Sequence, residues 1–183
     1  MTSVQLLGMK HTGKSTLGRL LAQNKGLDFD ELDLLLEAEQ GLQPLLNSRE
    51  IFRSLGRARF QELEALAAKK VAQRMSKTLL VLAWGGGTID NPVAVEALRG
   101  QGLLVHLVET PKVLFDRILR GGLPAFLSAD RPWEDFQKLY ERRTNAMSAI
   151  CDVEFSLEGR PIDQAFQDLL NVLDDVERRT HAR

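Results

Sequence analysis

The stretch from Gly8 to Thr16, GMKHTGKST, constrains the fold more than any other part of the chain. It matches the pattern GxxxxGK[ST], in which a glycine-rich loop joins a strand to a helix. A short apolar run, residues 4–7, precedes the loop, and leucines at helical spacing follow it. Backbone N–H groups at the N-terminus of such a helix can converge on phosphate oxygens without obstruction by side chains. The sequence therefore predicts a nucleotide-binding loop in an α/β fold.

The loop also predicts which atoms hold the nucleotide. Lys14 should reach the β- and γ-phosphates, and the hydroxyl of Ser15 should face Mg²⁺. A side chain at position 11 usually points away from the phosphates, so we expect no catalytic role for it. We expect ATP and Mg²⁺ as cofactors. The other residues expected at the nucleotide are Gly8, His11, Thr12, Gly13 and Thr16.

Composition restricts the class of protein. With 183 residues the chain has the length of one domain, and we expect a single P-loop kinase domain over residues 1–183. A net charge of −1 gives no strong field to attract nucleic acid or an anionic membrane. The single cysteine, Cys151, excludes an internal disulfide and fits a reducing compartment. We expect a cytoplasmic monomer with neither nucleic acid nor membrane as a partner.

Short apolar runs alternate with helical patterns along the chain, as in parallel strands joined by helical crossovers. The alternation predicts a three-layer α/β fold with a five-stranded parallel sheet. The expected strands are residues 4–7, 27–29, 78–83, 103–108 and 153–156. The expected helices are residues 14–24, about 57–74, 92–99, 111–119, 132–147 and 161–176.

Two segments interrupt the alternation. The first begins at residue 31 and is rich in helix formers, with a break at about residues 41–47; the second reads RGGLPAFLSADR, residues 120–131. Long segments in a compact domain are usually binding elements or lids. Phosphoryl transfer needs a wall for the acceptor and a lid that excludes water. We therefore expect residues 31–60 to form an acceptor-binding, helical region and residues 120–131 to form a mobile lid.

Acids and glycines follow two of the expected strands. Glu31 and Asp33 are two residues apart, a spacing that in an extended chain directs both side chains to the same side. One could hold magnesium and the other could accept a proton from the acceptor hydroxyl, or both could cap the following helix. The triplet of residues 85–87 suits a backbone that approaches a ligand closely, although a flexible turn is the alternative. Trp84, before it, could pack in the core or form a pocket wall.

These residues resemble the shikimate kinases, which are P-loop proteins of the nucleoside-monophosphate-kinase-like type. The resemblance covers nearly the whole chain. It implies transfer of a phosphoryl group from ATP to shikimate, a step in aromatic amino acid biosynthesis. The features that carry it are the P-loop, the acid pair followed by Glu37, the Phe60 and Glu64 helix, the glycine triplet, the lid, and an arginine nine residues before Asp152.

The resemblance assigns a role to several residues. Glu31 takes the place of the usual magnesium-binding aspartate, and Asp33 matches the acid that holds the acceptor hydroxyls. Arg143 matches the arginine that pairs with the acceptor carboxylate. The remaining assignments are Gly85, Gly86 and Gly87 around the acceptor, with Gly86 presenting its N–H, and Arg117 and Pro161 beside the adenine.

Two departures from the family pattern concern arginines. Gln61 stands where the family has a second arginine for the carboxylate, and a neutral amide cannot form a charge-assisted bidentate pair. Arg57 lies one helical turn earlier and could supply the missing charge to the acceptor. In the lid, Leu123 replaces the usual arginine, which leaves Arg120 or Arg131 as substitutes; we take Arg120 as the catalytic one.

Three hypotheses follow. The first is a kinase for a small polyhydroxylated carboxylic acid, most simply shikimate. The second is a related kinase for another hydroxy acid such as gluconate. The third, suggested by the missing arginines, is a nucleotide-binding regulator that has lost catalysis. Two further residues are expected to have no chemical role: His106 lies in a buried strand, and Cys151 has no histidine or second cysteine near it in sequence.

Overall fold

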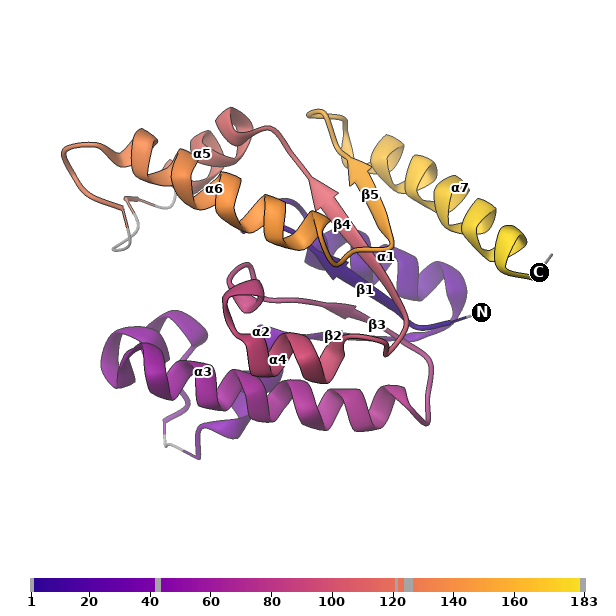
Figure 1. The fold of residues 1–183 in the computed structure, drawn as a ribbon, viewed down its shortest axis with the longest axis horizontal. Helices are drawn as coiled ribbons and strands as arrows, with labels where there is room; N and C mark the ends of the chain where they lie inside the picture. The colour runs from indigo at the N-terminus through magenta and orange to yellow at the C-terminus, as the bar shows by residue number, and fades with distance from the viewer. Residues whose placement is uncertain (1, 42–43, 121, 124–126, 182–183) are drawn as a thin grey trace.

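A single five-stranded parallel sheet forms the centre of the protein, with the strand order β2-β3-β1-β4-β5 (Figure 1). The computed structural model describes residues 2–41, 44–120, 122–123 and 127–181. Three of the five strands have the predicted bounds, and the other two are shifted by one to two residues. The strands are β1 (Val4–Leu7), β2 (Asp28–Glu31), β3 (Leu80–Ala83), β4 (Leu103–Val108) and β5 (Val153–Ser156).

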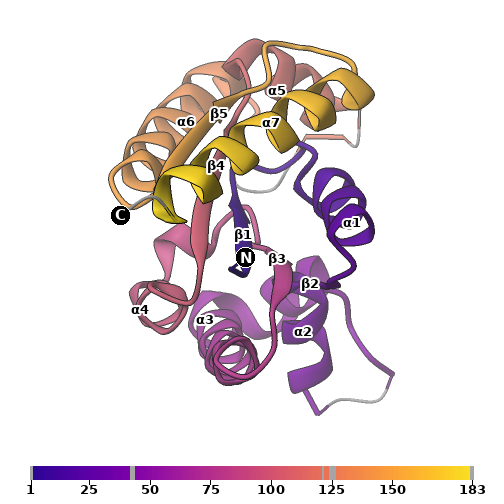
Figure 2. The same ribbon diagram turned by 90° about the vertical axis from the view of Figure 1, so that its right-hand side faces the viewer.

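Helices cover both faces of this sheet and confirm the three-layer α/β fold (Figure 2). Alternate strand residues enter two separate apolar cores. Leu6 and Val81 pack with α1 and α7, whereas Leu7 and Leu82 pack with the helices of the opposite face. The helices are α1 (Lys14–Lys25), α2 (Leu32–Glu39), α3 (Ser48–Met75), α4 (Pro92–Leu98), α5 (Pro111–Leu119), α6 (Pro132–Ser148) and α7 (Ile162–His181), with a short 3₁₀ helix η1 (Thr88–Asp90).

The segment after β2 is more regular than predicted. It forms α2 and the first part of α3, and only the stretch between these helices is irregular among the described residues. Asn47 and Glu50 form a reciprocal capping box that starts α3 at Ser48, nine residues before the predicted start. Gly56, with φ 77° and ψ 173°, then interrupts the helix in a conformation that glycine adopts most readily.

The strand order brings two loops together at the carboxyl ends of the strands. β1 lies between β3 and β4, so the connections after β1 and β3 are neighbours at the carboxyl ends of the strands. Ligands of open α/β sheets bind where the order of strands reverses in this way. Within the expected lid, residues 121 and 124–126 lie outside the described residues. None of the described helices has the length and apolar character needed to cross a membrane.

Candidate active site

The loop between β1 and α1 has the backbone geometry of a phosphate cradle. Gly8 has φ 153°, and a Cβ there would lie 2.7 Å from the carbonyl oxygen of Leu107. Gly13 has φ 90° and precedes α1 as its N-cap, so the free N–H groups of the first helical turn point toward the loop. The side chain of Thr12 turns inward and donates a hydrogen bond to the Met9 carbonyl (2.9 Å). Gly8 and Thr12, two of the residues predicted to bind the nucleotide, therefore shape the loop.

Lys14 places its ammonium group inside this loop. Its Nζ donates to the carbonyl oxygens of Gly8 (3.0 Å) and Met9 (2.9 Å). Burial lowers the pKa of Lys14 to about 8, although the nearby carboxylates of Asp33 and Glu31 raise it. The loop thus holds a cation at the position where a phosphate oxygen could accept one of its hydrogen bonds.

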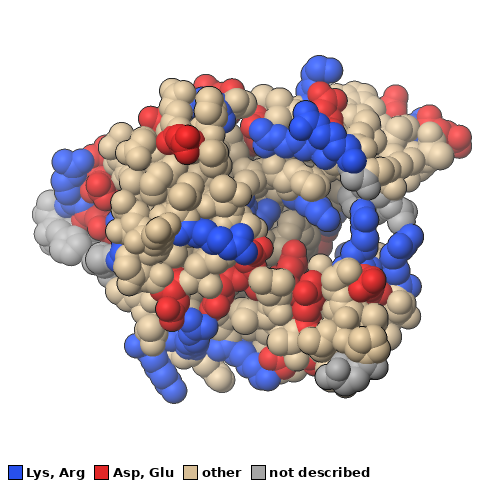
Figure 3. All heavy atoms as spheres, turned by 180° about the vertical axis from the view of Figure 1, so that it is seen from behind, with Lys and Arg blue, Asp and Glu red and all other residues tan. Residues whose placement is uncertain are grey.

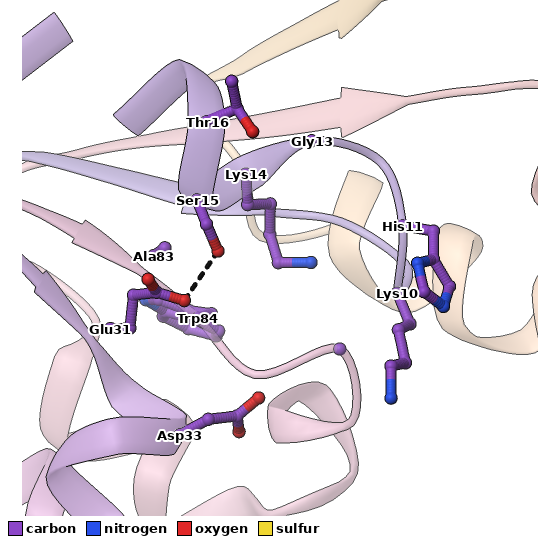
Figure 4. Close-up of a pocket in the computed structure, with 11 residues that line it drawn as sticks. Lys10, His11, Gly13, Lys14, Ser15, Thr16, Glu31, Asp33, Ala83 and Trp84 are labelled. Atoms are coloured by element: carbon purple, nitrogen blue, oxygen red, sulfur yellow. Dashed lines mark hydrogen bonds between the residues drawn. The ribbon is translucent and has the colours of Figure 1, made fainter. Parts of the chain in front are cut away.

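Ser15 and Glu31 meet beside the lysine. The hydroxyl of Ser15 donates to Glu31 Oε2 (2.6 Å; Figure 4). Arg19 pairs with the other carboxylate oxygen. A hydroxyl and a carboxylate are oxygen donors of the kind that magnesium prefers. Their contact brings together the two residues that the sequence predicted as metal ligands.

Asp33 reaches the same space from a helix and not, as predicted, from an extended chain. The helix α2 begins at Leu32, so Asp33 lies in its first turn, and Glu31 is the N-cap residue without a side-chain capping bond. Burial raises the pKa of Asp33, whereas the charge of Lys14 opposes this shift. Figure 4 shows the carboxyl group directed into the space below the P-loop. A partly buried carboxylate opposite a phosphate cradle can accept a proton from an alcohol.

A pocket of about 310 Å³ joins these groups. It lies on the face that Figure 3 shows hollowed, with acidic side chains near the hollow and lysines and arginines around it. The pocket brings together eight predicted residues and adds Lys10, Ala83 and Trp84. The predicted ones are His11, Gly13, Lys14, Ser15, Thr16, Glu31, Asp33 and Gly86.

Trp84 serves in both of the ways that the sequence left open. Its side chain lines the pocket, yet only 3% of the residue is exposed. The indole Nε1 donates to the buried amide of Gln5 (2.8 Å), whose own nitrogen donates to the Leu98 carbonyl. The pocket wall is therefore fixed to β1 by a satisfied polar contact inside the core.

The glycine triplet packs against protein on three sides. A Cβ on Gly85 would lie 2.5 Å from Asp33 Oδ1, and one on Gly86 would lie 2.9 Å from the backbone nitrogen of Lys10. A Cβ on Gly87 would lie 3.1 Å from Arg143 Nη2. The close approach that the triplet predicted is thus made to the P-loop and the site side chains; a contact with a ligand stays a prediction.

A buried carboxylate on α3 holds the turn that follows the triplet. Glu64 accepts hydrogen bonds from the Thr88 hydroxyl (2.7 Å) and the Asn91 amide (2.9 Å). Burial raises the pKa of Glu64, and these two hydrogen bonds oppose the shift. Gln61 Nε2 donates to the backbone carbonyl of Asp90 (3.1 Å). The two residues of α3 therefore position η1 next to the pocket.

Arg143, which the sequence predicted as the ligand of the acceptor carboxylate, lies close to the triplet and is bound to a residue that the sequence did not indicate. Its guanidinium donates to the Gly86 carbonyl and to the carboxylate of Asp90, which Arg142 also contacts. The sequence feature that could have indicated Asp90 is its position three residues after the glycine triplet. Only the tertiary structure shows that α6 meets it.

Two predicted arginines are not brought to the pocket. Arg57 and Arg120 are exposed, and within the described part of the chain neither guanidinium forms a hydrogen bond or ion pair. Arg57 follows directly on the interruption at Gly56. By contrast, Arg117 Nη1 donates to the His11 carbonyl (3.0 Å), which places it beside the P-loop. Pro161 is exposed immediately before α7.

A second polar cluster lies away from the pocket. The sequence gave Cys151 no neighbouring histidine, but its Sγ, His106 Nδ1 and a Glu154 oxygen lie within 4.8 Å of one another. The parallel register pairs His106 with Glu154 across β4 and β5. The hydroxyl of Ser148 is 3.2 Å from His106 Nδ1 and donates to Glu154, so it links these two groups. His106 is buried and hydrogen-bonded, as predicted.

Comparisons with known proteins agree on one family. A sequence profile of the family described as shikimate kinase matches residues 10–174. The shikimate kinase of Thermus thermophilus is 31% identical over 173 residues, which cover 94% of this chain and 90% of that protein. The shikimate kinase of Geobacter sulfurreducens is 30% identical over 167 residues, with coverages of 91% and 88%.

Solved structures give the same result. The shikimate kinase of Acinetobacter baumannii in complex with shikimate aligns with a TM-score of 0.78 and 25% identity over 96% of this chain and 94% of that one. The shikimate kinase of Bacteroides thetaiotaomicron gives 0.76 and 26%, over 94% and 98%. A gluconokinase of Sinorhizobium meliloti, at 0.55 and 16%, over 98% of each chain, shares the fold alone.

Proposed function

The chain belongs to the shikimate kinase family, whose members transfer a phosphoryl group to an alcohol, and we propose that it phosphorylates shikimate with ATP. One observation carries this proposal beyond the family: Lys14, the Ser15–Glu31 pair and Asp33 line one pocket. A phosphate cradle, oxygen donors for a metal and a carboxylate that faces them are the parts that phosphoryl transfer requires. The reaction is a step of the shikimate pathway.

The donor set fits magnesium as a cofactor. Mg²⁺ is commonly bound by one or two carboxylates together with nucleotide phosphates and water. We propose that Glu31 and the Ser15 hydroxyl, 2.6 Å apart, hold the ion. When bound, it neutralises part of the phosphate charge. Lys14 would add a second positive charge from inside the P-loop.

We propose that Asp33 orients the acceptor hydroxyl and receives its proton. As the acceptor oxygen forms a bond to the γ-phosphorus, the bond from that phosphorus to the bridging oxygen of ADP breaks, and the hydroxyl proton passes to the carboxylate. The position of Asp33 against Gly85 and below the P-loop supports this role. Its elevated pKa makes it a stronger base than an exposed aspartate.

The acceptor is proposed to lie between the P-loop and Asp33, beside Gly86, with its carboxylate toward Arg143. Gly86 lines the pocket, and its carbonyl accepts a hydrogen bond from Arg143. This contact supports an acceptor that extends from the pocket to Arg143. Arg57 is exposed, so the structure gives no support to its proposed role as a second ligand of the acceptor carboxylate. Arg120 remains a proposal for the lid cation: it lies one turn beyond Arg117, which already contacts the P-loop.

We further propose that residues 31–60 act as the acceptor-binding region and residues 120–131 as the lid of one kinase domain. We propose a monomer as the active form, because one chain supplies the phosphate loop, the metal ligands and the carboxylate that the reaction needs. Because the reaction consumes ATP and Cys151 is a free thiol, we propose a cytoplasmic location. Sedimentation equilibrium at enzyme concentrations used for assay tests the monomer.

The experiment that tests the function is a coupled assay of ADP release with shikimate or gluconate as acceptor. We expect release that depends on shikimate and a phosphorylated product visible by ³¹P NMR. Turnover with gluconate alone would favour the related kinase. Binding of ATP without release of ADP in the presence of millimolar shikimate would favour a nucleotide-binding regulator and contradict the proposal.

A further inference from the structure

Asp90 binds the guanidinium of Arg143, the group that the proposed function assigns to the acceptor carboxylate. Its Oδ2 accepts hydrogen bonds from Arg143 Nε (2.9 Å) and Nη2 (2.8 Å). Both side chains are largely shielded, with 12% of Asp90 and 19% of Arg143 exposed. A carboxylate of the protein therefore already makes the type of contact that an acidic acceptor would need.

A second arginine strengthens the hold on this carboxylate. Arg142 Nη1 donates to Asp90 Oδ1 (2.6 Å) from the neighbouring position on α6. Burial by itself would raise the pKa of Asp90, but the hydrogen bonds from the two arginines outweigh it and hold the pKa below its usual value. Asp90 is thus charged at neutral pH and cancels one of the two positive charges.

The surrounding structure fixes Asp90 in place. Gln61 binds its backbone carbonyl, and Glu64 binds Thr88 and Asn91, which lie on either side of it in sequence. The 3₁₀ helix η1 that carries Asp90 is therefore attached to α3 at three points. A shift of the Asp90 side chain, and not of its backbone, is the simplest way to free Arg143.

Few donors of Arg143 remain for a ligand. A guanidinium has five N–H groups. Three nitrogens of Arg143 are already engaged: Nε and Nη2 with Asp90, and Nη1 with the Gly86 carbonyl (3.2 Å). Gln61, at the position where the family has its other arginine, offers no charge. An incoming carboxylate must share Arg143 with Asp90 or displace it.

We propose that Asp90 is an internal competitor for the acceptor carboxylate at Arg143 and so determines how strongly this kinase favours an acidic acceptor. The inference rests on the proposed function and deepens it. It predicts weaker discrimination between shikimate and its uncharged methyl ester than a free arginine would give. It concerns binding of the acceptor and not the chemical step, because both Asp90 and Arg143 lie outside the set of residues that line the pocket with Lys14 and Asp33.

The test compares Asp90→Asn with the unchanged protein, using shikimate and shikimate methyl ester as acceptors. For shikimate we expect Asp90→Asn to lower KM by about three- to tenfold. The change is smaller than complete loss of a charge-assisted hydrogen bond would give, because the asparagine oxygen remains a neutral acceptor for Arg143. For the ester we expect little change in KM, and for both acceptors a kcat within about twofold. Asp28→Asn is the matched control, since Asp28 pairs with Arg74 (2.9 Å) at the opposite end of its strand from the site.

Arg142→Gln gives a second, independent variant. The Arg142 side chain is 58% exposed, so its replacement should leave the fold intact. Asp90 would then bind Arg143 alone, and we expect KM for shikimate to rise while that for the ester stays the same. The Arg142→Gln variant tests whether Asp90 competes for Arg143 even if Asp90→Asn does not fold.

The outcomes separate the two proposals. If Asp90→Asn raises KM for shikimate, or changes both acceptors equally, Asp90 positions Arg143 and the inference is wrong. If Arg142→Gln leaves both KM values unchanged, the inference is wrong as well. Absence of turnover with shikimate in every variant, with retained ATP binding, would refute the proposed function itself.

Discussion

The charge of Lys14 makes nucleotide affinity sensitive to pH. Its pKa is lowered to about 8, so in the free protein the ammonium is present below that value and is lost as the pH rises through it. Phosphates favour the charged form, and binding ATP above pH 8 must therefore take up a proton. We expect the Kd for ATP to rise between pH 7 and 9.5, by up to about tenfold per pH unit above the pKa.

Calorimetry in buffers of different ionisation enthalpy measures both the affinity and the proton uptake. Lys14→Met is the control, because it should bind ATP weakly and lose most of the pH dependence. A Kd that is constant from pH 7 to 9.5, without proton uptake, would show that Lys14 remains charged throughout.

Asp33 should control the chemical step. We expect Asp33→Asn to lower kcat by about 10²- to 10⁴-fold, since the amide cannot accept the proton of the acceptor. In the unchanged protein, kcat/KM should fall as the pH drops through the raised pKa of Asp33, at a midpoint above 3.8, because the carboxylate is the active form. Steady-state rates across this range check the prediction.

The Kd for ATP serves as the control for Asp33→Asn and should change little. Asp33→Asn with nearly full kcat would leave the pocket without its proton acceptor and contradict the proposed mechanism.

At the scale of residues, sequence predicts best where chemistry fixes the spacing. The P-loop positions could be assigned because their roles depend on a local backbone shape. Asp90 could not, since its importance arises from α6 crossing η1 and from no local pattern. Arg57 was placed by helical periodicity, which indicates a face of a helix but not what that face meets.

At the scale of elements, the glycine triplet leaves little space for an added side chain. We expect Gly86→Ala to reduce kcat/KM strongly, because its Cβ would lie 2.9 Å from P-loop backbone, which cannot move aside cheaply. Gly87→Ala is the comparison: its Cβ would meet the end of the Arg143 side chain at 3.1 Å, so we expect a smaller loss that appears in the KM for the acceptor and not in the affinity for ATP. Kinetics of the two variants at equal fold stability measure the difference.

Equal losses in both variants would show that the triplet needs glycine for its flexibility and not for the close approach of backbone to backbone.

The elements also show where periodicity is sufficient and where it fails. β1 and β4 were predicted at their observed bounds because short, mainly apolar runs between turns indicate buried strands. The start of α3 was missed because the apolar stripe weakens before Gly56, although Asn47 and Glu50 carry a capping signal. Asp33 was assigned to an extended chain because two-residue spacing fits a strand as well as the first turn of a helix.

For the whole molecule, ligand binding should appear as thermal stability. A ligand that binds only the native state at about 100 times its Kd adds about 2.7 kcal/mol. For a protein of this size we expect Mg-ATP to raise Tm by about 5–11 °C. Differential scanning fluorimetry with Mg-ATP, and with Lys14→Ala as the control, measures the shift. An equal shift in both proteins would place the nucleotide outside the P-loop.

At this scale the sequence predicted the class of fold and left the strand order open. Alternating strands and helices indicate a parallel sheet, but each crossover can return the chain to either side of the preceding strand. The order found here decides which loops meet, and with it the contact between the triplet and the P-loop.

The two tryptophans of the chain provide separate optical probes. Trp84 lies in the wall of the nucleotide pocket, whereas Trp133, in the first turn of α6, packs edge-on against Phe115 with ring centroids 5.1 Å apart. Indole emission depends on local polarity. Replacing one tryptophan at a time with phenylalanine would therefore let stopped-flow fluorescence follow events at the pocket and at the start of α6 as distinct signals.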